Sequence, residues 1–211
     1  MRDEVVRVEC GDVVMACRVA GATGSPAVVL LHALGEQSTT WDDLTPRLAD
    51  SFRTHAFDLR GHGLSGWTDS YSLEQMRDDV LAAIDRLALA PVTLVGHSMG
   101  AIVAYLVAMQ RPHVVERLVL EEPVAPLPRD HAIPQRPSAP LGFDWAVVPA
   151  IVGQVNSPDP TWWTRLAEIT APTLLVGGGA DSHVPQDKLA MMAARCSTTG
   201  ACRFSPLRAQ C

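Results

Sequence analysis

The sequence lacks a long hydrophobic run. Its apolar stretches end well before the roughly 18–20 residues that a membrane-spanning helix requires. The N-terminus, MRDEVVRVEC, places charged residues where a secretory signal peptide carries its apolar stretch. We therefore expect no membrane partner and a cytoplasmic location.

The sequence also lacks a cluster of basic residues. Its 17 Lys and Arg residues are outnumbered by 23 Asp and Glu residues, which gives a formal net charge of −6. Nucleic acids and anionic membranes are bound by surfaces on which positive charge is gathered. The composition therefore indicates no nucleic-acid partner.

Paired or metal-binding cysteines are missing as well. The five cysteines form an odd set whose spacings match neither a metal site nor a redox pair. They are Cys10, Cys17, Cys196, Cys202 and Cys211. We interpret them as reduced thiols in a reducing compartment, and we expect no metal ion and no cofactor.

The 211 residues suffice for one domain with a substantial core, since 47% of them are hydrophobic and 19% are charged. Predicted strands and helices alternate along the chain. An antiparallel hairpin is predicted from residues 4–10 and 13–20, around a Gly-Asp turn. Later strands are predicted at 26–31, 53–57, 91–96, 115–122 and 172–178, and helices at 41–49, 72–87, 98–110, 161–169 and 185–196. This α/β alternation predicts a mostly parallel sheet with helices on both faces.

Two segments depart from this alternation. Residues 123–160 hold more than half of the sixteen prolines and show little periodicity, so we interpret them as a short irregular cap. The cap divides the core into an N-terminal part, 1–122, and a C-terminal part, 161–195. Residues 196–211 show neither a buried-strand run nor apolar periodicity, so we expect an atypical tail and a sheet whose last strand and helix are missing. A bare sheet edge would favour a homodimer or aggregation.

The stretch VGHSMG, from Val95 to Gly100, places Ser98 between two glycines at a strand-to-helix junction. G-x-S-x-G in this context is typical of a nucleophile elbow. Its sharp turn exposes the serine in a strained backbone conformation, at a cost on the order of 1–3 kcal/mol. The following helix also directs its free amides toward the serine. The motif predicts that Ser98 is a nucleophile.

Four stretches together resemble the α/β-hydrolase family. LLHALGEQSTTW resembles its strand-then-loop segment, FDLRGHGLS its glycine-rich loop, VGHSMGA its nucleophile elbow and APTLLVGGGADSHVP its acid-bearing strand and loop. They occur in the family's order, from about residue 5 to residue 190. The resemblance implies the α/β-hydrolase fold and an esterase-like or lipase-like activity on a small-molecule substrate.

The resemblance also implies roles for particular residues. Ser98 corresponds to the nucleophile, and the backbone amides of Leu34 and Met99 correspond to the oxyanion hole. Asp181 stands at the position of the catalytic acid. A second acid position, after the preceding strand, would be occupied by Glu121 or Glu122.

The histidine of the catalytic triad is not found. In this family it follows the acid by one helix and one strand, roughly 20–30 residues, but the last histidine of this chain is His183. His183 shares a loop with Asp181, so we do not expect it to act as the base. We interpret His32, His62 and His97 as structural or packing residues. The family pattern places neither His113 nor His131.

The sequence therefore predicts a hydrolase of an ester or related acyl substrate that acts through Ser98 and an acyl-enzyme, impaired by the missing histidine. The alternative is a non-catalytic binding or interaction protein that has kept the pocket. A haloperoxidase-like activity without metal would use the same triad, and the sequence does not separate it from the hydrolase.

Overall fold

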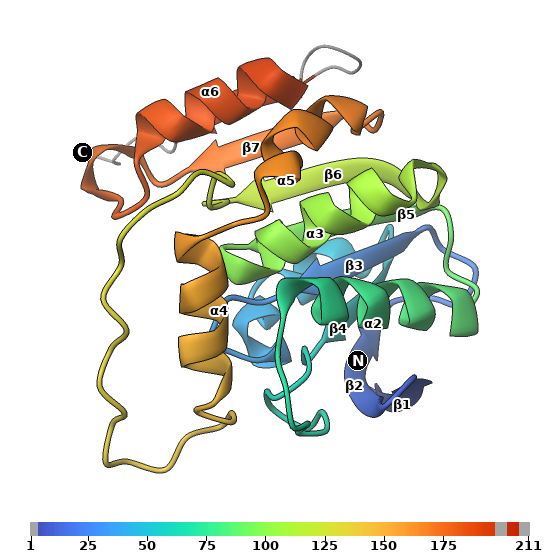
Figure 1. Cartoon of the computed structure of the whole chain (residues 1–211). Helices are drawn as coiled ribbons and strands as arrows, with labels where there is room; N and C mark the ends of the chain where they lie inside the picture. The colour runs from blue at the N-terminus through green and yellow to red at the C-terminus, as the bar shows by residue number, and fades with distance from the viewer. Residues whose placement is uncertain (1–3, 197–201, 207–211) are drawn as a thin grey trace.

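The computed structural model describes residues 4–196 and 202–206, which form an eight-stranded sheet with the strand order β1-β2-β4-β3-β5-β6-β7-β8 (Figure 1). The strands are β1 (Glu4–Cys10), β2 (Val13–Ala20), β3 (Ala27–Leu31), β4 (Arg53–Phe57), β5 (Val92–His97), β6 (Val115–Glu121), β7 (Thr173–Gly177) and β8 (Cys202–Pro206). β1 pairs antiparallel with β2, and β2 pairs antiparallel with β4. All later pairs are parallel, as the sequence predicted.

Helices cover both faces of the sheet. They are α1 (Thr45–Leu48), α2 (Leu73–Arg86), α3 (Met99–Gln110), α4 (Val147–Asn156), α5 (Pro160–Arg165) and α6 (Gln186–Cys196). The larger core joins α2, α3 and α6 to one face, where Val29 and Leu31 of β3 point. Val28 and Leu30 alternate with them and pack with Trp41 in a smaller core on the opposite face.

The burial of α3 follows directly from its sequence, MGAIVAYLVAMQ. All of its residues except the last are buried, because the helix is apolar on every side and packs between α2 and the strands β5 and β6. α2 is amphipathic instead, and it begins at Ser72, whose hydroxyl accepts the Gln75 amide at 3.1 Å. A rigid α3 fixes the position of the elbow at its N-terminus.

The expectation that the last strand is missing was wrong. β8 lies inside the segment interpreted as an atypical tail and pairs in parallel with β7 over residues 202–206. Cys202 and Phe204 of this strand turn inward, while Arg203 and Ser205 are exposed. Two alternating apolar residues are enough for an edge strand, but they are too few to form a recognisable run. The rest of the tail, 197–201 and 207–211, lies outside the described residues.

The expectation of an irregular cap was wrong for part of its length. Residues 122–146 contain neither a helix nor a strand, apart from one bridge between His62 and Phe143, but residues 147–156 form α4. The cap segment and α4 lie at the edge where the parallel strands end, which is also where the elbow stands (Figure 1). The cap therefore closes over the carboxyl ends of the strands, where open α/β sheets bind their ligands.

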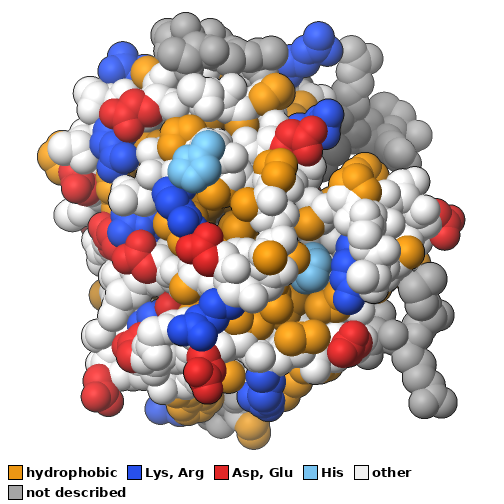
Figure 2. All heavy atoms as spheres, turned by 90° about the vertical axis from the view of Figure 1, so that its right-hand side faces the viewer, with side chains coloured by type: hydrophobic (Ala, Val, Ile, Leu, Met, Phe, Trp, Pro, Cys, Tyr) orange, Lys and Arg blue, Asp and Glu red, His pale blue; other side chains and the backbone are white. Residues whose placement is uncertain are grey.

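The opposite edge of the sheet looks different. Figure 2 shows that face with Lys and Arg side chains interspersed among Asp and Glu, and the coloured part of the view contains no gathered basic surface. Within residues 4–196 and 202–206, no helix is long and apolar enough to cross a membrane.

Candidate active site

Ser98 stands at the turn between β5 and α3 in a backbone conformation that few residues adopt, with φ 50° and ψ −109°. Its amide donates to the carbonyl of Glu121 at 2.9 Å. The two flanking glycines allow the turn: a Cβ on Gly96 would lie 2.3 Å from the Gly100 carbonyl oxygen, and one on Gly100 would lie 2.2 Å from that of Leu31. The turn therefore has the geometry of the elbow that the motif predicted.

Two backbone amides are available beside Ser98. Met99 is the first residue of α3, so its amide has no carbonyl partner within the helix. In the loop after β3, the Ala33 amide is directed to the Glu36 carboxylate (3.4 Å) and the Gly35 amide to Nε2 of His62 (3.2 Å). The intervening Leu34 amide has no hydrogen-bond acceptor among the described residues. Both predicted oxyanion donors are thus left free to bind an anion.

His32 and His62 are structural, as expected. Nε2 of His32 accepts the Leu59 amide at 2.9 Å, which leaves Nδ1 to donate to the Ala33 carbonyl at 2.8 Å. His62 accepts from Gly35 in the same manner and donates to the Arg60 carbonyl at 3.0 Å. Burial lowers the pKa of His32 to about 3 and also lowers that of His62. Both imidazoles are therefore neutral, and both hold the loop after β3 (residues 32–37).

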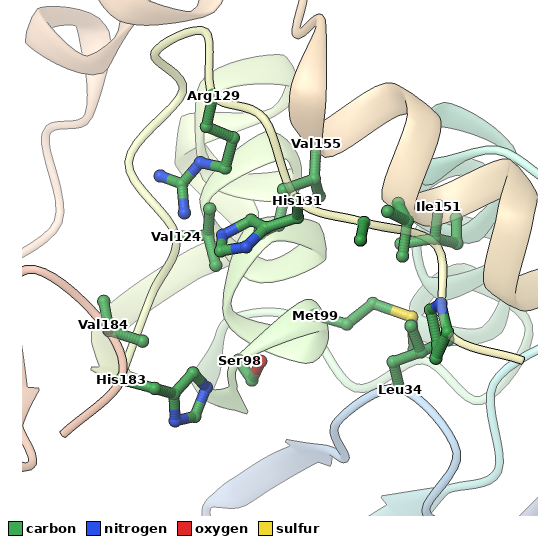
Figure 3. Close-up of a pocket in the computed structure, with 14 residues that line it drawn as sticks. Leu34, Ser98, Met99, Val124, Arg129, His131, Ile151, Val155, His183 and Val184 are labelled. Atoms are coloured by element: carbon green, nitrogen blue, oxygen red, sulfur yellow. The ribbon is translucent and has the colours of Figure 1, made fainter.

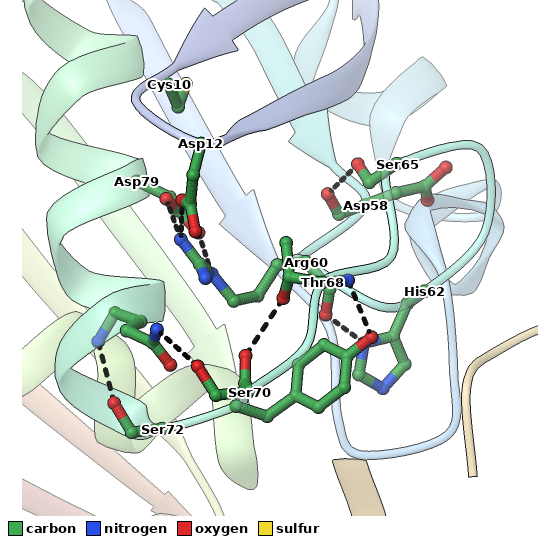
Figure 4. Close-up of polar contacts among 12 residues, drawn as sticks. Cys10, Asp12, Asp58, Arg60, His62, Ser65, Thr68, Ser70, Ser72 and Asp79 are labelled. Atoms are coloured by element: carbon green, nitrogen blue, oxygen red, sulfur yellow. Dashed lines mark hydrogen bonds and ion pairs between the residues drawn. The ribbon is translucent and has the colours of Figure 1, made fainter. Parts of the chain in front are cut away.

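A buried ion-pair network supports the glycine-rich loop from which His62 extends (Figure 4). Arg60 contacts both carboxylate oxygens of Asp79, at 2.5 and 2.7 Å, and one of Asp12 at 3.0 Å. Asp58 accepts the Ser38 amide at 2.6 Å and the Leu64 amide at 2.8 Å. The network connects the glycine-rich loop to the hairpin turn, to α2 and to Ser38, which follows the loop after β3.

The three candidate acids, Asp181, Glu121 and Glu122, lie in different environments. Glu122 has a positive φ of 48°, and its carboxylate accepts from the Gly178 amide, the Ser182 hydroxyl and the Gln186 side chain. Asp181 is exposed, and its carboxylate has no hydrogen-bond partner among the described residues. Glu121 contributes its backbone carbonyl to Ser98. Glu122 therefore anchors the loop that carries Asp181.

A cavity of about 430 Å³ opens beside Ser98, under the cap (Figure 3). It is lined by Leu34, Ser98, Met99, Ile102, Val124, Arg129, His131, Ala132, Pro134, Ile151, Val152, Val155, His183 and Val184. Its volume falls in the range of small-molecule sites. Asp181, Glu121 and Glu122 do not line it.

Two histidines that the sequence analysis did not assign to the site, His131 and His183, line the cavity. His183 lies on the wall with Ser98, and His131 enters from the cap (Figure 3). Neither forms a hydrogen bond with the Ser98 hydroxyl, which has no side-chain partner among the described residues. The cap positions of Arg129 and His131 depend on α4, and no local motif identifies them. His97 lies outside the cavity, with Nδ1 3.7 Å from the Glu36 carboxylate.

Within the same described ranges, no group of three or more His, Cys, Asp or Glu side chains has the arrangement of a metal site. Burial raises the pKa of the Cys10 thiol to about 11 and also raises that of Cys17, so both are protonated at neutral pH. These two buried thiols are therefore inert packing residues.

Comparisons with known proteins agree with this geometry. The model of the alpha/beta hydrolase fold matches residues 26–152. An sn-1-specific diacylglycerol lipase of Mus musculus is 40% identical over 110 residues, which are 50% of this chain and 36% of that protein. A pimeloyl-[acyl-carrier protein] methyl ester esterase of Sodalis glossinidius is 39% identical over 97 residues, 46% of this chain and 36% of the esterase.

Solved structures show the same fold. A thioesterase domain from the curacin biosynthetic pathway superimposes with a TM-score of 0.83 and 24% sequence identity, covering 98% of this chain and 93% of that domain. The chain matches 30% to 40% of the length of its curated relatives. With the family model matched over more than half of the chain, and with the strand order and elbow described above, this chain belongs to the alpha/beta hydrolase fold family.

Proposed function

We propose that this chain hydrolyses an ester or related acyl substrate through Ser98. The observation that carries the proposal is the strained serine at the N-terminus of α3, beside a cavity and two backbone amides that have no acceptor among the described residues. The family includes esterases and lipases among the relatives that match this chain. Because one fold supports many reactions, the site rather than the fold supports the choice of acyl chemistry.

In the proposed reaction, Oγ of Ser98 attacks the carbonyl carbon of the substrate and loses its proton. The amides of Leu34 and Met99 stabilise the negative charge on the carbonyl oxygen, a contribution of roughly 2.7–4 kcal/mol for one such donor in other enzymes. The tetrahedral intermediate expels the protonated alcohol and leaves an acyl-enzyme. Water then releases the acid and regenerates the serine hydroxyl.

We also propose that hydrolysis through Ser98 is impaired. A base must remove the serine proton, and no histidine follows His183 in this sequence. Removal of the histidine from a serine-hydrolase triad lowers turnover on the order of 10⁶-fold. The oxyanion hole and binding alone retain roughly 10³–10⁴-fold acceleration over the reaction in water. We therefore expect slow turnover.

Asp181 is the proposed acid, with Glu121 or Glu122 as the alternative. The exposed Asp181 carboxylate is free to orient a base. The Glu122 carboxylate instead accepts hydrogen bonds from three groups in or next to the loop that carries Asp181 (residues 178–185, called the acid loop below). We assign Glu122 the role of holding that loop.

A fluorophosphonate probe tests the nucleophile. It forms a covalent bond to an activated serine oxygen and releases fluoride, so labelling reports the acylation step alone. We expect slow labelling of the wild-type chain that Ser98→Ala abolishes. Ser70→Ala is the matched control, because Ser70 is an exposed serine distant from the cavity wall. Equal labelling of Ser98→Ala would exclude Ser98 as the nucleophile.

A non-catalytic binding protein is the second candidate. It is favoured because, among the described residues, no base forms a hydrogen bond with the Ser98 hydroxyl. In that case the wild-type chain, folded by circular dichroism, reacts neither with the probe nor with p-nitrophenyl acetate. It would still bind an acyl compound in the cavity. Turnover of p-nitrophenyl acetate that depends on Ser98 would exclude this candidate.

A further inference from the structure

Arg129 is the charged residue of the cavity wall that the proposed reaction does not use. Its side chain extends from the cap toward the space beside Ser98 (Figure 3). Nη2 donates to the carbonyl of Ala125 at 3.1 Å, while Nε is buried without a hydrogen-bond partner in the described part of the chain. Among the same residues, no carboxylate forms an ion pair with this guanidinium.

The surroundings of Arg129 are apolar. Val124, Ile151 and Val155 form much of the wall, and burial lowers the pKa of Arg129 from its ordinary value. A guanidinium nevertheless stays charged in a protein. A partly buried charge with an unsatisfied donor is unfavourable until an anion contacts it.

The cap holds Arg129 in a defined place. Its amide donates to the Asn156 carbonyl at 3.1 Å, at the end of α4. The Asn156 side chain also joins the next turn of the cap, accepting from the His131 amide and donating to the His131 carbonyl, both at 2.9 Å. These bonds fix the backbone on both sides of residue 130. The position of the guanidinium is therefore built into the cap.

We propose that Arg129 binds a carboxylate on the acyl part of the substrate, so that the cavity takes a half ester of a dicarboxylic acid. This inference rests on the proposed function at Ser98 and adds the charge of the substrate to it. Arginine favours carboxylates because its planar fork forms two parallel hydrogen bonds. The apolar wall between Arg129 and Ser98 suits the methylene chain that separates the two carbonyl groups. The imidazole of His131 is a second group near the carboxylate.

Binding to Ser98→Ala protein tests this inference without requiring catalysis. Titration calorimetry compares monomethyl esters of the C4 to C8 dicarboxylic acids with methyl esters of the monocarboxylic acids of equal length. We expect one or two chain lengths of the charged series to bind more tightly, on the order of 10-fold to 100-fold, as for a charge-assisted hydrogen-bonded pair. Equal affinity of the two series would overturn the proposal.

Variants in the same background locate the effect. We expect Arg129→Gln to abolish the preference for the charged series and Arg129→Lys to retain part of it. Arg136→Gln is the matched control, because Arg136 is an exposed arginine of the same cap outside the cavity wall. If Arg129→Gln does not fold, an unchanged preference in Arg129→Lys at raised ionic strength would still contradict the ion pair. A preference that survives Arg129→Gln would also overturn it.

The two proposals fail separately. Without probe labelling but with selective binding of the half ester, the nucleophile proposal fails and the carboxylate site stands. With labelling at Ser98 but no charge preference, the hydrolase stands and the carboxylate site fails.

Discussion

Arg60 is buried and Arg129 is partly buried, and the two arginines have very different surroundings. Arg60 is 3% exposed and contacts the carboxylates of Asp79 and Asp12. The side chain of Arg129 extends from the cap and, among the described residues, donates a hydrogen bond only to the Ala125 carbonyl. The charge of Arg60 is neutralised by these carboxylates, so this residue supports the glycine-rich loop that carries His62. The charge of Arg129 has no internal counterion there, so it is available to a ligand.

Removal of the Arg60 charge gives the largest expected effect. Arg60→Gln leaves Asp79, which is itself 3% exposed, without its ion-pair partner. Breaking one side of a buried pair destabilises a protein by about 3–5 kcal/mol. We expect urea unfolding to show a loss of this size. Arg117→Gln, which removes an exposed pair with Glu116, is the control and should change stability little. A small effect at Arg60 would mean that the network does not hold the loop.

The pH dependence of stability sharpens the comparison, because Asp79 and His32 act in opposite directions. Burial raises the pKa of Asp79 from 3.8 to about 6, against the opposing effect of Arg60. Between pH 4 and 6 the folded state therefore binds more protons at Asp79 than the unfolded state does, and this contribution to stability falls as pH rises. Burial lowers the pKa of His32 to about 3, so its contribution falls as pH decreases below about 6.5.

Asp79→Asn separates these two contributions. In the wild type they partly cancel between pH 4 and 6. The variant loses only the Asp79 contribution, so its free energy of unfolding should rise more steeply with pH than that of the wild type. Urea unfolding at half-unit steps of pH measures the difference. Parallel curves for the two proteins would show that Asp79 has the same pKa in the folded and unfolded states.

The acid loop shows a similar contrast, between the hydrogen-bonded carboxylate of Glu122 and the exposed carboxylate of Asp181. Glu122→Gln weakens hydrogen bonds to the Gly178 amide and the Ser182 hydroxyl, so we expect a loss of about 1–3 kcal/mol. Asp181→Asn changes an exposed carboxylate, and the stability should stay within about 0.5 kcal/mol.

Probe labelling distinguishes the two roles in the acid loop. If Asp181 orients a base that acts on Ser98, its substitution slows labelling of Ser98 without a loss of stability. Substitution of Glu122 should slow labelling only to the extent that the loop unfolds. A stable Glu122→Gln protein with strongly reduced labelling would reverse the assignment.

The features that the sequence predicted well are encoded by neighbouring residues. Gly96, Ser98 and Gly100 lie within five positions, and the close contacts that require glycine come from the two elements that they join. The strand β3 is a continuous apolar run, and β5 is mostly apolar. Local pattern was therefore sufficient to predict a mostly parallel sheet with helices on both faces and to locate the elbow.

The missed features depend on contacts between distant segments. β8 carries only two inward apolar residues and forms because β7 offers an unpaired edge. His183 reaches the cavity because Glu122, sixty-one positions earlier, holds its loop through Ser182. Arg129 is placed by Asn156 at the end of α4. No periodicity within these segments indicates such contacts. The helix α4 was not predicted because it lies in a proline-rich segment and is buried by contacts with the rest of the fold.

A small expected change in stability completes the comparison of the two arginines. Arg129→Gln loses one hydrogen bond to Ala125 but also removes a partly buried charge without a counterion, so the two effects oppose each other. We expect the free energy of unfolding in urea to stay within about 1 kcal/mol of the wild type, far from the loss at Arg60. A ligand that binds only the folded state raises Tm by mass action. A saturating half ester should therefore raise the Tm of Ser98→Ala protein that retains Arg129 and leave that of the double variant unchanged. A large destabilisation by Arg129→Gln without ligand would instead make Arg129 a second structural arginine, like Arg60.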